Sequence, residues 1–266
     1  MNYQMIIYEI KNHIGYITLN RPNVMNAINM QMREEIIDVC GQVRGDPDVR
    51  VCILTGAGEK AFCTGLDLKE QATQTRNQSF FAARRARNQP GISQHHQAIA
   101  ALDKPTIAAI RGYAVGGGLE IALACDMRVA AEDARLGMME VRRGRLGGSG
   151  GTQRLPRLIG TAKALELCLT GEPVEAAEAL RLGLVNRVVP VHQLMAAAEE
   201  IAGKICLGAP LSVIAIKEAI TKGVELPIEQ GLKLENELGL ALSTTEDQKE
   251  GARAFAEKRP AVWKGA

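Results

Sequence analysis

Two short apolar runs restrict the folds open to this chain more than any other feature. Residues 51–55 (VCILT) and 106–110 (TIAAI) are continuous rather than alternating, which is typical of strands buried on both faces of a sheet. Residues 127–131 form a weaker third run. Helical patterns over about 91–101 and 117–124 separate these strands. Strands and helices therefore alternate, and we predict an α/β protein built from repeated ββα or βαβ units.

The segments on either side of this core follow other patterns. Two strands are predicted at 5–9 and 14–19, and apolar residues at helical spacing predict an amphipathic helix over about 30–43. After about residue 150 the pattern becomes helical, with expected helices at 161–169, 174–182, 192–205, 211–222 and 227–242 and one strand at 185–189. We therefore expect a core over residues 1–195 and a C-terminal helical region over 196–266 that covers another surface, such as a second subunit.

Composition and charge argue against several classes of protein. The 32 Lys and Arg against 30 Asp and Glu leave a net charge of +2, and aromatic residues make up only 3%, so neither charge nor stacking favours nucleic acid. The N-terminus MNYQMIIYEI lacks a basic and then apolar signal pattern, and no run approaches the roughly 18 apolar residues of a membrane span. The 6 cysteines form no CxxC pair and no His/Cys cluster has metal spacing. We expect a cytoplasmic protein without a metal site.

The motif with the most chemical content is Gly116-Gly117-Gly118-Leu-Glu120, which follows the expected strand 106–110. Bare glycine N–H groups at a helix start, together with the helix dipole, suit a developing anion. The same glycines could instead serve only to let the helix and a strand pack closely. Glu120 favours the chemical interpretation, because a carboxylate in an almost wholly apolar helix needs a partner or a task.

Two other glycine motifs allow different enzymes. GAGEKA at 56–61 fits a dinucleotide-binding fingerprint, but charged residues follow its second glycine and no helical pattern starts there. GGSGG at 147–151 fits the GxSxG pattern of the serine-hydrolase nucleophile elbow. However, no clear strand precedes it, and only His192 follows it as a possible base. A helix N-cap at Ser149 or Thr152 is the better interpretation of this motif.

Three ordered blocks carry a family resemblance: GAGEKAFCTGLDLKE at 56–70, KPTIAAIRGYAVGGGLEIALACD at 104–126 and GMMEVRRGRLGGSGGTQRLPRLIG at 137–160. Segments 19–29 and 245–265 extend it almost end to end. With these blocks the chain resembles the crotonase, or enoyl-CoA hydratase/isomerase, superfamily, and within it the enoyl-CoA hydratases most. The resemblance implies a crotonase-like spiral of ββα repeats with a C-terminal helical region that forms trimers, often paired as hexamers.

The resemblance also implies chemistry on an acyl-CoA thioester, with no cofactor besides the CoA of the substrate itself. The backbone N–H groups of Leu66 and Gly117 would form an oxyanion hole, although Leu66 is bulkier than the alanine common at its position. Glu120 matches the position of the water-activating base, and Glu140 that of the proton donor. A full pair of glutamates favours hydration over double-bond isomerisation, since isomerases of this family often retain only one such acid.

By resemblance, further residues would hold the substrate. The CoA arm is expected along Val24, Ala27, Ala61, Thr64, Gly65, Asp67, Leu68, Lys69 and Gly116, with Phe255 and Lys258, from the same or a neighbouring subunit, over the adenosine. The acyl group would lie against Met138, Met139 and Arg143 and under the polar segment 71–90, which we predict to be a mobile loop or a poorly ordered helix.

The sequence departs from the family just after Glu140, where Arg142, Arg143 and Arg145 replace mostly apolar residues and a proline. These arginines either face solvent or a subunit contact, or one of them enters the acyl pocket and pairs with a carboxylate or hydroxyl of an unusual acyl group. Alternatives to the hydratase also stay open. They are a Δ-isomerase, another dehydratase or hydrolase acting on a cyclic or polar acyl-CoA, and a non-catalytic CoA- or RNA-binding scaffold.

Overall fold

The computed structural model describes residues 3–73 and 94–266. Most of the polar segment predicted at 71–90 and the start of the helix predicted at 91–101 therefore lie outside the described residues. The strands are β1 Ile6–Lys11, β2 Ile14–Leu19, β3 Val51–Gly56, β4 Ala61–Cys63, β5 Thr106–Ile110, β6 Tyr113–Val115, β7 Met127–Ala131, β8 Arg135–Gly137, β9 Val174–Glu175 and β10 Arg187–Val189. The helices are α1 Met30–Gly45, α2 Leu68–Thr73, α4 Gln94–Ala100, α5 Gly117–Ala124, α6 Gly151–Ile159, α7 Thr161–Thr170, α8 Ala176–Arg181, α9 Leu194–Cys206, α10 Pro210–Gly223, α11 Ile228–Ser243 and α12 Glu246–Ala256, with 3-10 helices η1 Pro22–Val24, η2 Glu140–Arg143 and η3 Val191–Gln193.

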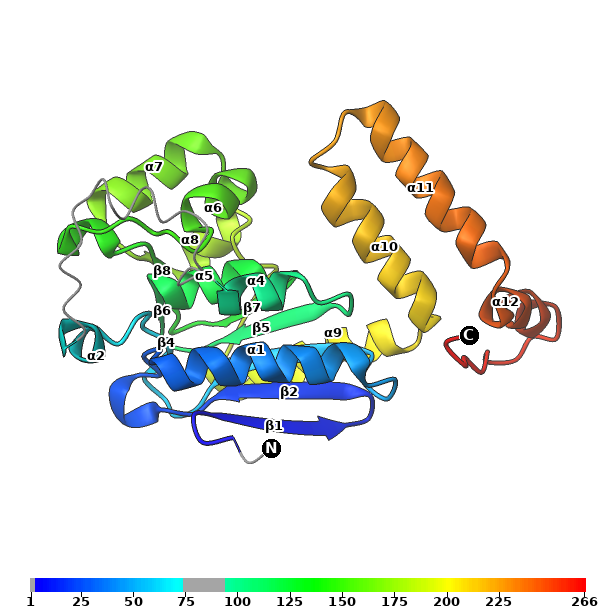
Figure 1. The fold of residues 1–266 in the computed structure, drawn as a ribbon, viewed down its shortest axis with the longest axis horizontal. Helices are drawn as coiled ribbons and strands as arrows, with labels where there is room; N and C mark the ends of the chain where they lie inside the picture. The colour runs from blue at the N-terminus through cyan, green and yellow to red at the C-terminus, as the bar shows by residue number, and fades with distance from the viewer. Residues whose placement is uncertain (1–2, 74–93) are drawn as a thin grey trace.

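The strands form two sheets that the chain visits in turn. The larger sheet has the order β1-β2-β3-β5-β7-β10, with β1 and β2 antiparallel and the remaining pairs parallel. The smaller sheet has the order β4-β6-β8-β9, and β4, β6 and β8 are parallel. Each of β3, β5 and β7 is thus followed by a strand of the smaller sheet. This repeat confirms the predicted α/β class and its spiral of ββα units (Figure 1).

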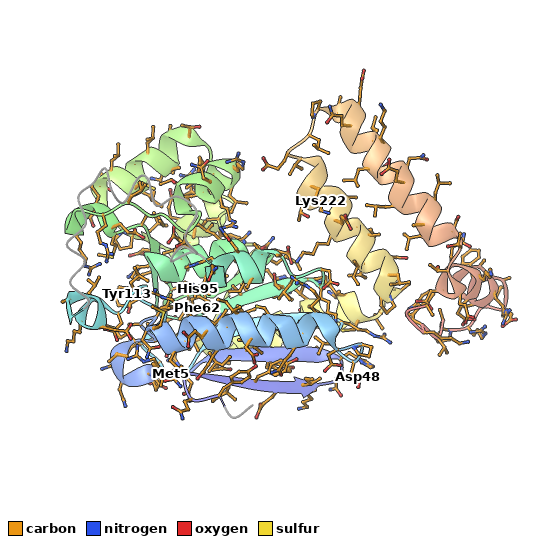
Figure 2. The ribbon with its side chains drawn as sticks, viewed as in Figure 1. Met5, Asp48, Phe62, His95, Tyr113 and Lys222 are labelled. Carbon is orange, nitrogen blue, oxygen red and sulfur yellow. The ribbon has the colours of Figure 1, made fainter. Side chains whose placement is uncertain are left out.

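The central strands are buried on both faces, as their continuous apolar runs predict. On β3, Cys52 and Leu54 pack into the cluster that α1, α4 and α5 share, whereas Val51 and Ile53 pack against α9 on the opposite face. Figure 2 shows Phe62 and His95 in the interior next to α1. The larger sheet therefore has helices packed on both of its faces.

The C-terminal helices divide into two groups. The predicted boundary at residue 195 falls within α9, and α9 packs on the large sheet through Ala198 and Ala202. Helices α10 and α11 pack against each other and stand apart from the core (Figure 1). One ion pair, Lys217 Nζ to Asp126 Oδ2 at 2.7 Å, ties α10 back to the core. Within the described ranges no helix is long and apolar enough to cross a bilayer.

Some predicted elements differ from the structure for local reasons. The helix predicted at 174–182 begins as strand β9, and only its remainder forms α8. The strand predicted at 185–189 is shortened to β10. Strands β4, β6 and β8 were not predicted, because a strand of 3 residues is too short for its side-chain alternation to be recognised. Helix α12 was also missed, and its sequence is largely polar.

Candidate active site

The glycine motif forms a sharp turn between β6 and α5. Gly116 has φ 57° and ψ −129°, a conformation that is essentially restricted to glycine, and its N–H donates to Gly137 O at 2.9 Å. A Cβ at Gly118 would lie 2.0 Å from Cys63 O. Gly118 therefore allows α5 to pack against β4, and Gly117 presents a bare N–H at the start of α5.

A second turn places the N–H of Leu66 beside that of Gly117. Gly65 has φ +83°, and a Cβ built on it would lie 2.8 Å from Gly117 N. Ile28 holds the backbone on either side of Leu66, since Ile28 N donates to Gly65 O and Asp67 N donates to Ile28 O. In the described part of the chain, neither the Leu66 N–H nor the Gly117 N–H has a protein acceptor. Two unpaired donors at one point form a site for an oxyanion.

Arg21, which sequence reasoning did not single out, fixes this second turn. Its guanidinium donates to Ala27 O and forms an ion pair with Asp67 Oδ2 at 3.0 Å. Asp67 Oδ1 also accepts hydrogen bonds from the N–H groups of Lys69 and Glu70 at the start of α2. Burial opposes the charge of Asp67, but these contacts outweigh it and hold the pKa of the carboxyl below its usual range.

Glu120 lies in the first turn of α5 with only 3% of its surface exposed. Its Oε1 accepts hydrogen bonds from Ser149 N at 2.7 Å and Gly151 N at 2.9 Å. Burial raises the pKa of this carboxyl, while these two hydrogen bonds and the nearby Arg154 act in the opposite direction. Glu120 is therefore a buried acid whose charged form already has donors.

Glu140 is the first residue of η2, and its Oε2 is buried without a hydrogen-bond partner among the described residues. Burial raises the pKa of Glu140, and the nearby carboxyl of Glu120 adds to this effect. A hydrogen bond from its own backbone N–H and the nearby Arg143 and Arg145 act in the opposite direction. Glu140 is thus the member of the pair that more readily keeps its proton.

The two carboxyls and the two N–H donors converge on one place. The Oε1 atoms of Glu120 and Glu140 each lie 3.5 Å from the point where a Cβ would stand on Gly147. Glu140 Oε1 also lies 3.3 Å from the corresponding point on Gly116, directly before the Gly117 N–H. A base, an acid and an oxyanion site in one buried space can form and protonate an enolate.

Comparison with known proteins agrees with this geometry. A family model described as enoyl-CoA hydratase/isomerase matches residues 9–266. The chain belongs to the enoyl-CoA hydratase/isomerase family. It is 46% identical to an (E)-benzylidenesuccinyl-CoA hydratase of Thauera aromatica, over 98% of this chain and 99% of that protein, and 41% identical to a short-chain-enoyl-CoA hydratase of Clostridium acetobutylicum, over 97% of both. The crystal structure of an enoyl-CoA hydratase from Bacillus anthracis matches with a TM-score of 0.91 and 43% identity, over 99% of this chain and 100% of that one.

The residues expected to bind CoA fall into two separate groups in one chain of this family member. Val24, Ala27 and the segment 64–69 lie together, because Thr64 N donates to Met25 O and Ile28 N to Gly65 O. Phe255, 87% exposed on α12, and Lys258 just after that helix lie at the other end of the molecule from α2 (Figure 1). A single chain therefore does not bring them to the segment 64–69, and their predicted role over the adenosine requires a neighbouring subunit.

The residues expected at the acyl pocket also separate. Met138 is buried, and its Cε lies 2.3 Å from the point where a Cβ would stand on Gly147, so it packs beneath the loop that supports Glu120. Met139 is half-buried and precedes η2, whereas Arg143 is exposed.

The expected N-cap at Ser149 or Thr152 is wrong, since Gly150 precedes the first residue of α6. Sequence reasoning missed that the N–H groups of Ser149 and Gly151 hold Glu120.

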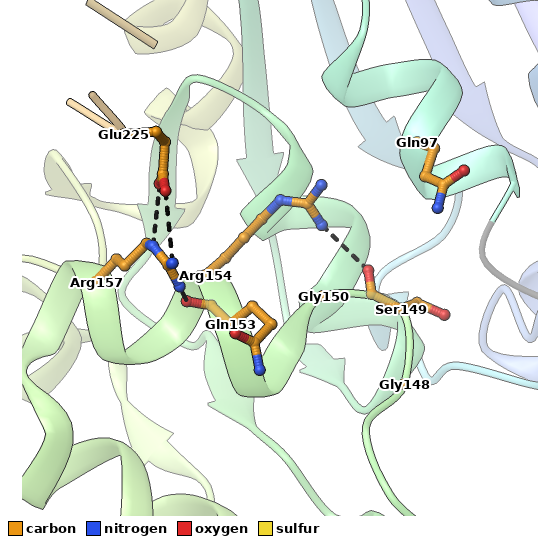
Figure 3. Close-up of a pocket in the computed structure, with 8 residues that line it drawn as sticks. All are labelled: Gln97, Gly148, Ser149, Gly150, Gln153, Arg154, Arg157 and Glu225. Atoms are coloured by element: carbon orange, nitrogen blue, oxygen red, sulfur yellow. Dashed lines mark hydrogen bonds and ion pairs between the residues drawn. The ribbon is translucent and has the colours of Figure 1, made fainter. Parts of the chain in front are cut away.

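A cavity of about 380 Å³ lies beside this loop, between α4, α6 and the turn after α10 (Figure 3). Arg154 Nη1 donates to Ser149 O there, and Arg157 Nε pairs with Glu225 at 3.0 Å. Neither Glu120 nor Glu140 lines this cavity, so it flanks the carboxyl pair rather than containing it. The lining residues are Gln97, Gly148, Ser149, Gly150, Gln153, Arg154, Arg157 and Glu225.

Across the described residues, no group of three or more His, Cys, Asp or Glu could hold a metal ion.

His96 is a buried histidine that contacts the backbone carbonyl of Gly117. It is 1% exposed, and its Nε2 lies 3.0 Å from Gly117 O. Because a carbonyl only accepts, Nε2 must carry a hydrogen. Burial, with smaller effects of Arg154 and Arg33, lowers the pKa of His96 to about 4 against the opposing hydrogen bond to Gly117, so the ring is neutral at pH 7.

The buried His96 gives the fold a dependence on pH. The unfolded chain takes up this proton near the ordinary histidine pKa of about 6.5, whereas the folded chain takes it up only near 4. Stability is therefore full above about pH 6.5 and falls as pH decreases toward 4, by up to about 1.4 kcal/mol per pH unit. Urea unfolding of the wild type and of His96→Gln should show a shallower loss of stability in the variant over this range. The exposed His192→Gln is the control, and equal slopes in all three proteins would contradict the prediction.

Proposed function

We propose that this protein is an enoyl-CoA hydratase, which adds water reversibly across the 2,3 double bond of a 2-enoyl-CoA thioester. The observation that carries the proposal is the convergence of two buried carboxyls, Glu120 and Glu140, beside the unpaired N–H groups of Leu66 and Gly117. Addition to an enoyl thioester places negative charge on the thioester oxygen, and two fixed N–H donors in a buried site stabilise that charge.

The two carboxyls take different roles in this reaction. Glu120 is the base that removes a proton from water, since the N–H groups of Ser149 and Gly151 favour its ionised form. The hydroxide bonds to the β-carbon, and the electron pair of the double bond moves toward the thioester oxygen. Glu140 then gives its proton to the α-carbon, and the proton taken by Glu120 restores the starting charge of the pair. The bare Oε2 and raised pKa of Glu140 support this assignment.

An activity screen tests the proposal directly. Crotonyl-CoA, longer linear 2-enoyl-CoAs and cyclic enoyl-CoAs are incubated with the protein, and loss of the conjugated double bond is followed with product analysis. Hydration of at least one of these thioesters is expected. Movement of the double bond without water addition would assign the site to an isomerase, and no turnover of any thioester would exclude both.

We further propose that the C-terminal helices assemble a trimer or a dimer of trimers. Helices α10 and α11 expose apolar side chains that the core of their own chain does not cover, and Phe255 and Lys258 reach a segment 64–69 only from another subunit. These apolar side chains are Ile216, Ile220, Val224, Ile228, Leu232 and Leu240. Light scattering should give the mass of such an assembly for the wild type and a lower mass for Ile220→Asp. A wild-type monomer at micromolar concentration would exclude the assembly.

We also propose that the protein works in the cytoplasm. All 6 cysteines are free, and 4 of them are buried. Unpaired thiols throughout a chain are typical of proteins that work in a reducing compartment.

A further inference from the structure

The backbone that holds Glu120 is itself held by Arg154, a half-buried residue of α6. The N–H groups of Ser149 and Gly151 donate to Glu120 Oε1 at 2.7 and 2.9 Å. The guanidinium of Arg154 donates through Nη1 to Ser149 O at 3.1 Å (Figure 3). This carbonyl belongs to the peptide between Ser149 and Gly150, which lies between the two peptides that donate to Glu120. One side chain therefore fixes the backbone on both sides of its contact with the carboxyl.

The backbone leaves room for this guanidinium at Gly150. Gly150 has φ +113°, in the left-handed region that favours glycine, and a Cβ built on it would collide with Arg154 Nη1. The backbone N–H of Arg154 also donates to Gly150 O at 2.7 Å. Arg154 thus contacts two successive carbonyls, Ser149 O and Gly150 O, and the glycine between them lets its guanidinium lie this close.

Arg154 stands where a helix ordinarily disfavours a positive charge. It lies in the first turn of α6, and the N-terminal end of a helix dipole is itself positive. Burial raises the pKa of the Glu120 carboxyl, and the charge of Arg154 is one of the effects that oppose this rise. The Glu140 carboxyl and the Cys168 thiol also interact with Glu120, and either would add negative charge on ionising. Arg154 therefore supplies positive charge that these two groups cannot.

Arg157, about one turn further along α6, differs from Arg154 in what it holds. Its Nη1 donates to Gln153 O at 2.8 Å, and its Nε pairs with Glu225 Oε1 at 3.0 Å (Figure 3). Both arginines line the same cavity, but the hydrogen bonds of Arg157 go to its own helix and to Glu225. Arg157 therefore places the same charge on the same helix without holding the backbone at Glu120.

We propose that Arg154 is a positioning residue for hydration, which fixes the peptide between Ser149 and Gly150 and so keeps two N–H donors aimed at Glu120. The inference rests on the proposed function and adds the side chain that prepares its base. Without the guanidinium, Ser149 O loses a charge-assisted hydrogen bond, and the backbone is free to turn its N–H groups away from the carboxylate. Glu120 then keeps its proton to higher pH and removes one from water less readily.

Hydration kinetics over a range of pH test this role. Arg154→Gln should lower kcat by about 10 to 100 times with KM nearly unchanged, because it misplaces the base without touching the substrate. The rise of kcat/KM with pH, which follows ionisation of Glu120, should move to higher pH. Arg157→Gln is the matched control, since it removes the same charge from the same helix and should keep the wild-type kcat and pH profile. Arg154→Lys, which keeps the charge and a donor, should lie between the wild type and Arg154→Gln.

Infrared spectroscopy follows the same carboxyl without turnover. The C=O band of protonated Glu120 is the one that Glu120→Gln lacks, and in Arg154→Gln it should persist to higher pH than in the wild type. The inference is overturned if this band titrates in folded Arg154→Gln as it does in the wild type or in Arg157→Gln. A lower kcat or a lower thermal stability with that unchanged titration would assign Arg154 to the fold alone. A wild type that hydrates no enoyl-CoA would reject the proposed function, while the infrared titration would still decide whether Arg154 acts on Glu120.

Discussion

Replacing Glu140 by glutamine is expected to lower kcat for hydration of a 2-enoyl-CoA by about 10² to 10⁴. The variant keeps the size and polarity of the side chain but cannot deliver a proton to the α-carbon. Glu140 Oε2 makes no hydrogen bond among the described residues, so the amide at that position breaks no hydrogen bond of this atom. Steady-state kinetics measure the loss, and calorimetry with the 3-hydroxyacyl-CoA product should show nearly unchanged binding.

A second variant, Glu120→Gln, tests whether the two glutamates act together. It should cause a loss of kcat of similar size, because base and acid act in one reaction. The double variant should lose little beyond either single one, since residues that act as a unit are strongly non-additive. The exposed Glu132→Gln serves as the control and should retain wild-type kinetics. Equal losses of product binding and kcat in Glu140→Gln would instead mean that Glu140 holds the structure.

The structure explains why Glu120 and Glu140 could be singled out from the sequence but the groups that hold Glu120 could not. Glu120 is notable in the sequence because it interrupts an apolar helix, and Glu140 follows from the order of the motif blocks. The donors to Glu120 are backbone N–H groups of Ser149 and Gly151, and any residue type except proline supplies such a group. The sequence shows the glycine-rich segment 147–151, but the contact of this segment with Glu120 depends on tertiary structure.

The same limit applies to the arginines that follow Glu140. Sequence reasoning left their role open between solvent and the acyl pocket, because adjacent residues of one type look alike in a sequence. The structure separates them: Arg142 pairs with Glu172 on the outside, whereas the guanidinium of Arg145 makes no hydrogen bond or ion pair among the described residues.

The oxyanion donors can be tested although they belong to the backbone, because Gly117 is the first residue of α5. Proline is tolerated at this position of a helix, and it removes the N–H itself. The extended ψ of Gly116 and its lack of a Cβ leave room for the proline ring on its preceding side. We expect Gly117→Pro to lower kcat/KM for hydration by about 10² to 10³ relative to Gly117→Ala.

Gly117→Ala is the proper reference for this variant, since alanine keeps the N–H and adds the same Cβ. That Cβ meets Gly65 Cα at 3.3 Å and Ile28 Cδ1 at 3.6 Å, so both variants share this modest crowding, and proline adds its ring Cδ where the N–H stood. Thermal unfolding shows whether the two are folded alike, and the ratio of their kcat/KM values then reports the replacement of the N–H by the ring carbon. Equal activity of folded Gly117→Pro and Gly117→Ala would mean that the Gly117 N–H does not stabilise the enolate, and would leave Leu66 as the donor to the thioester oxygen.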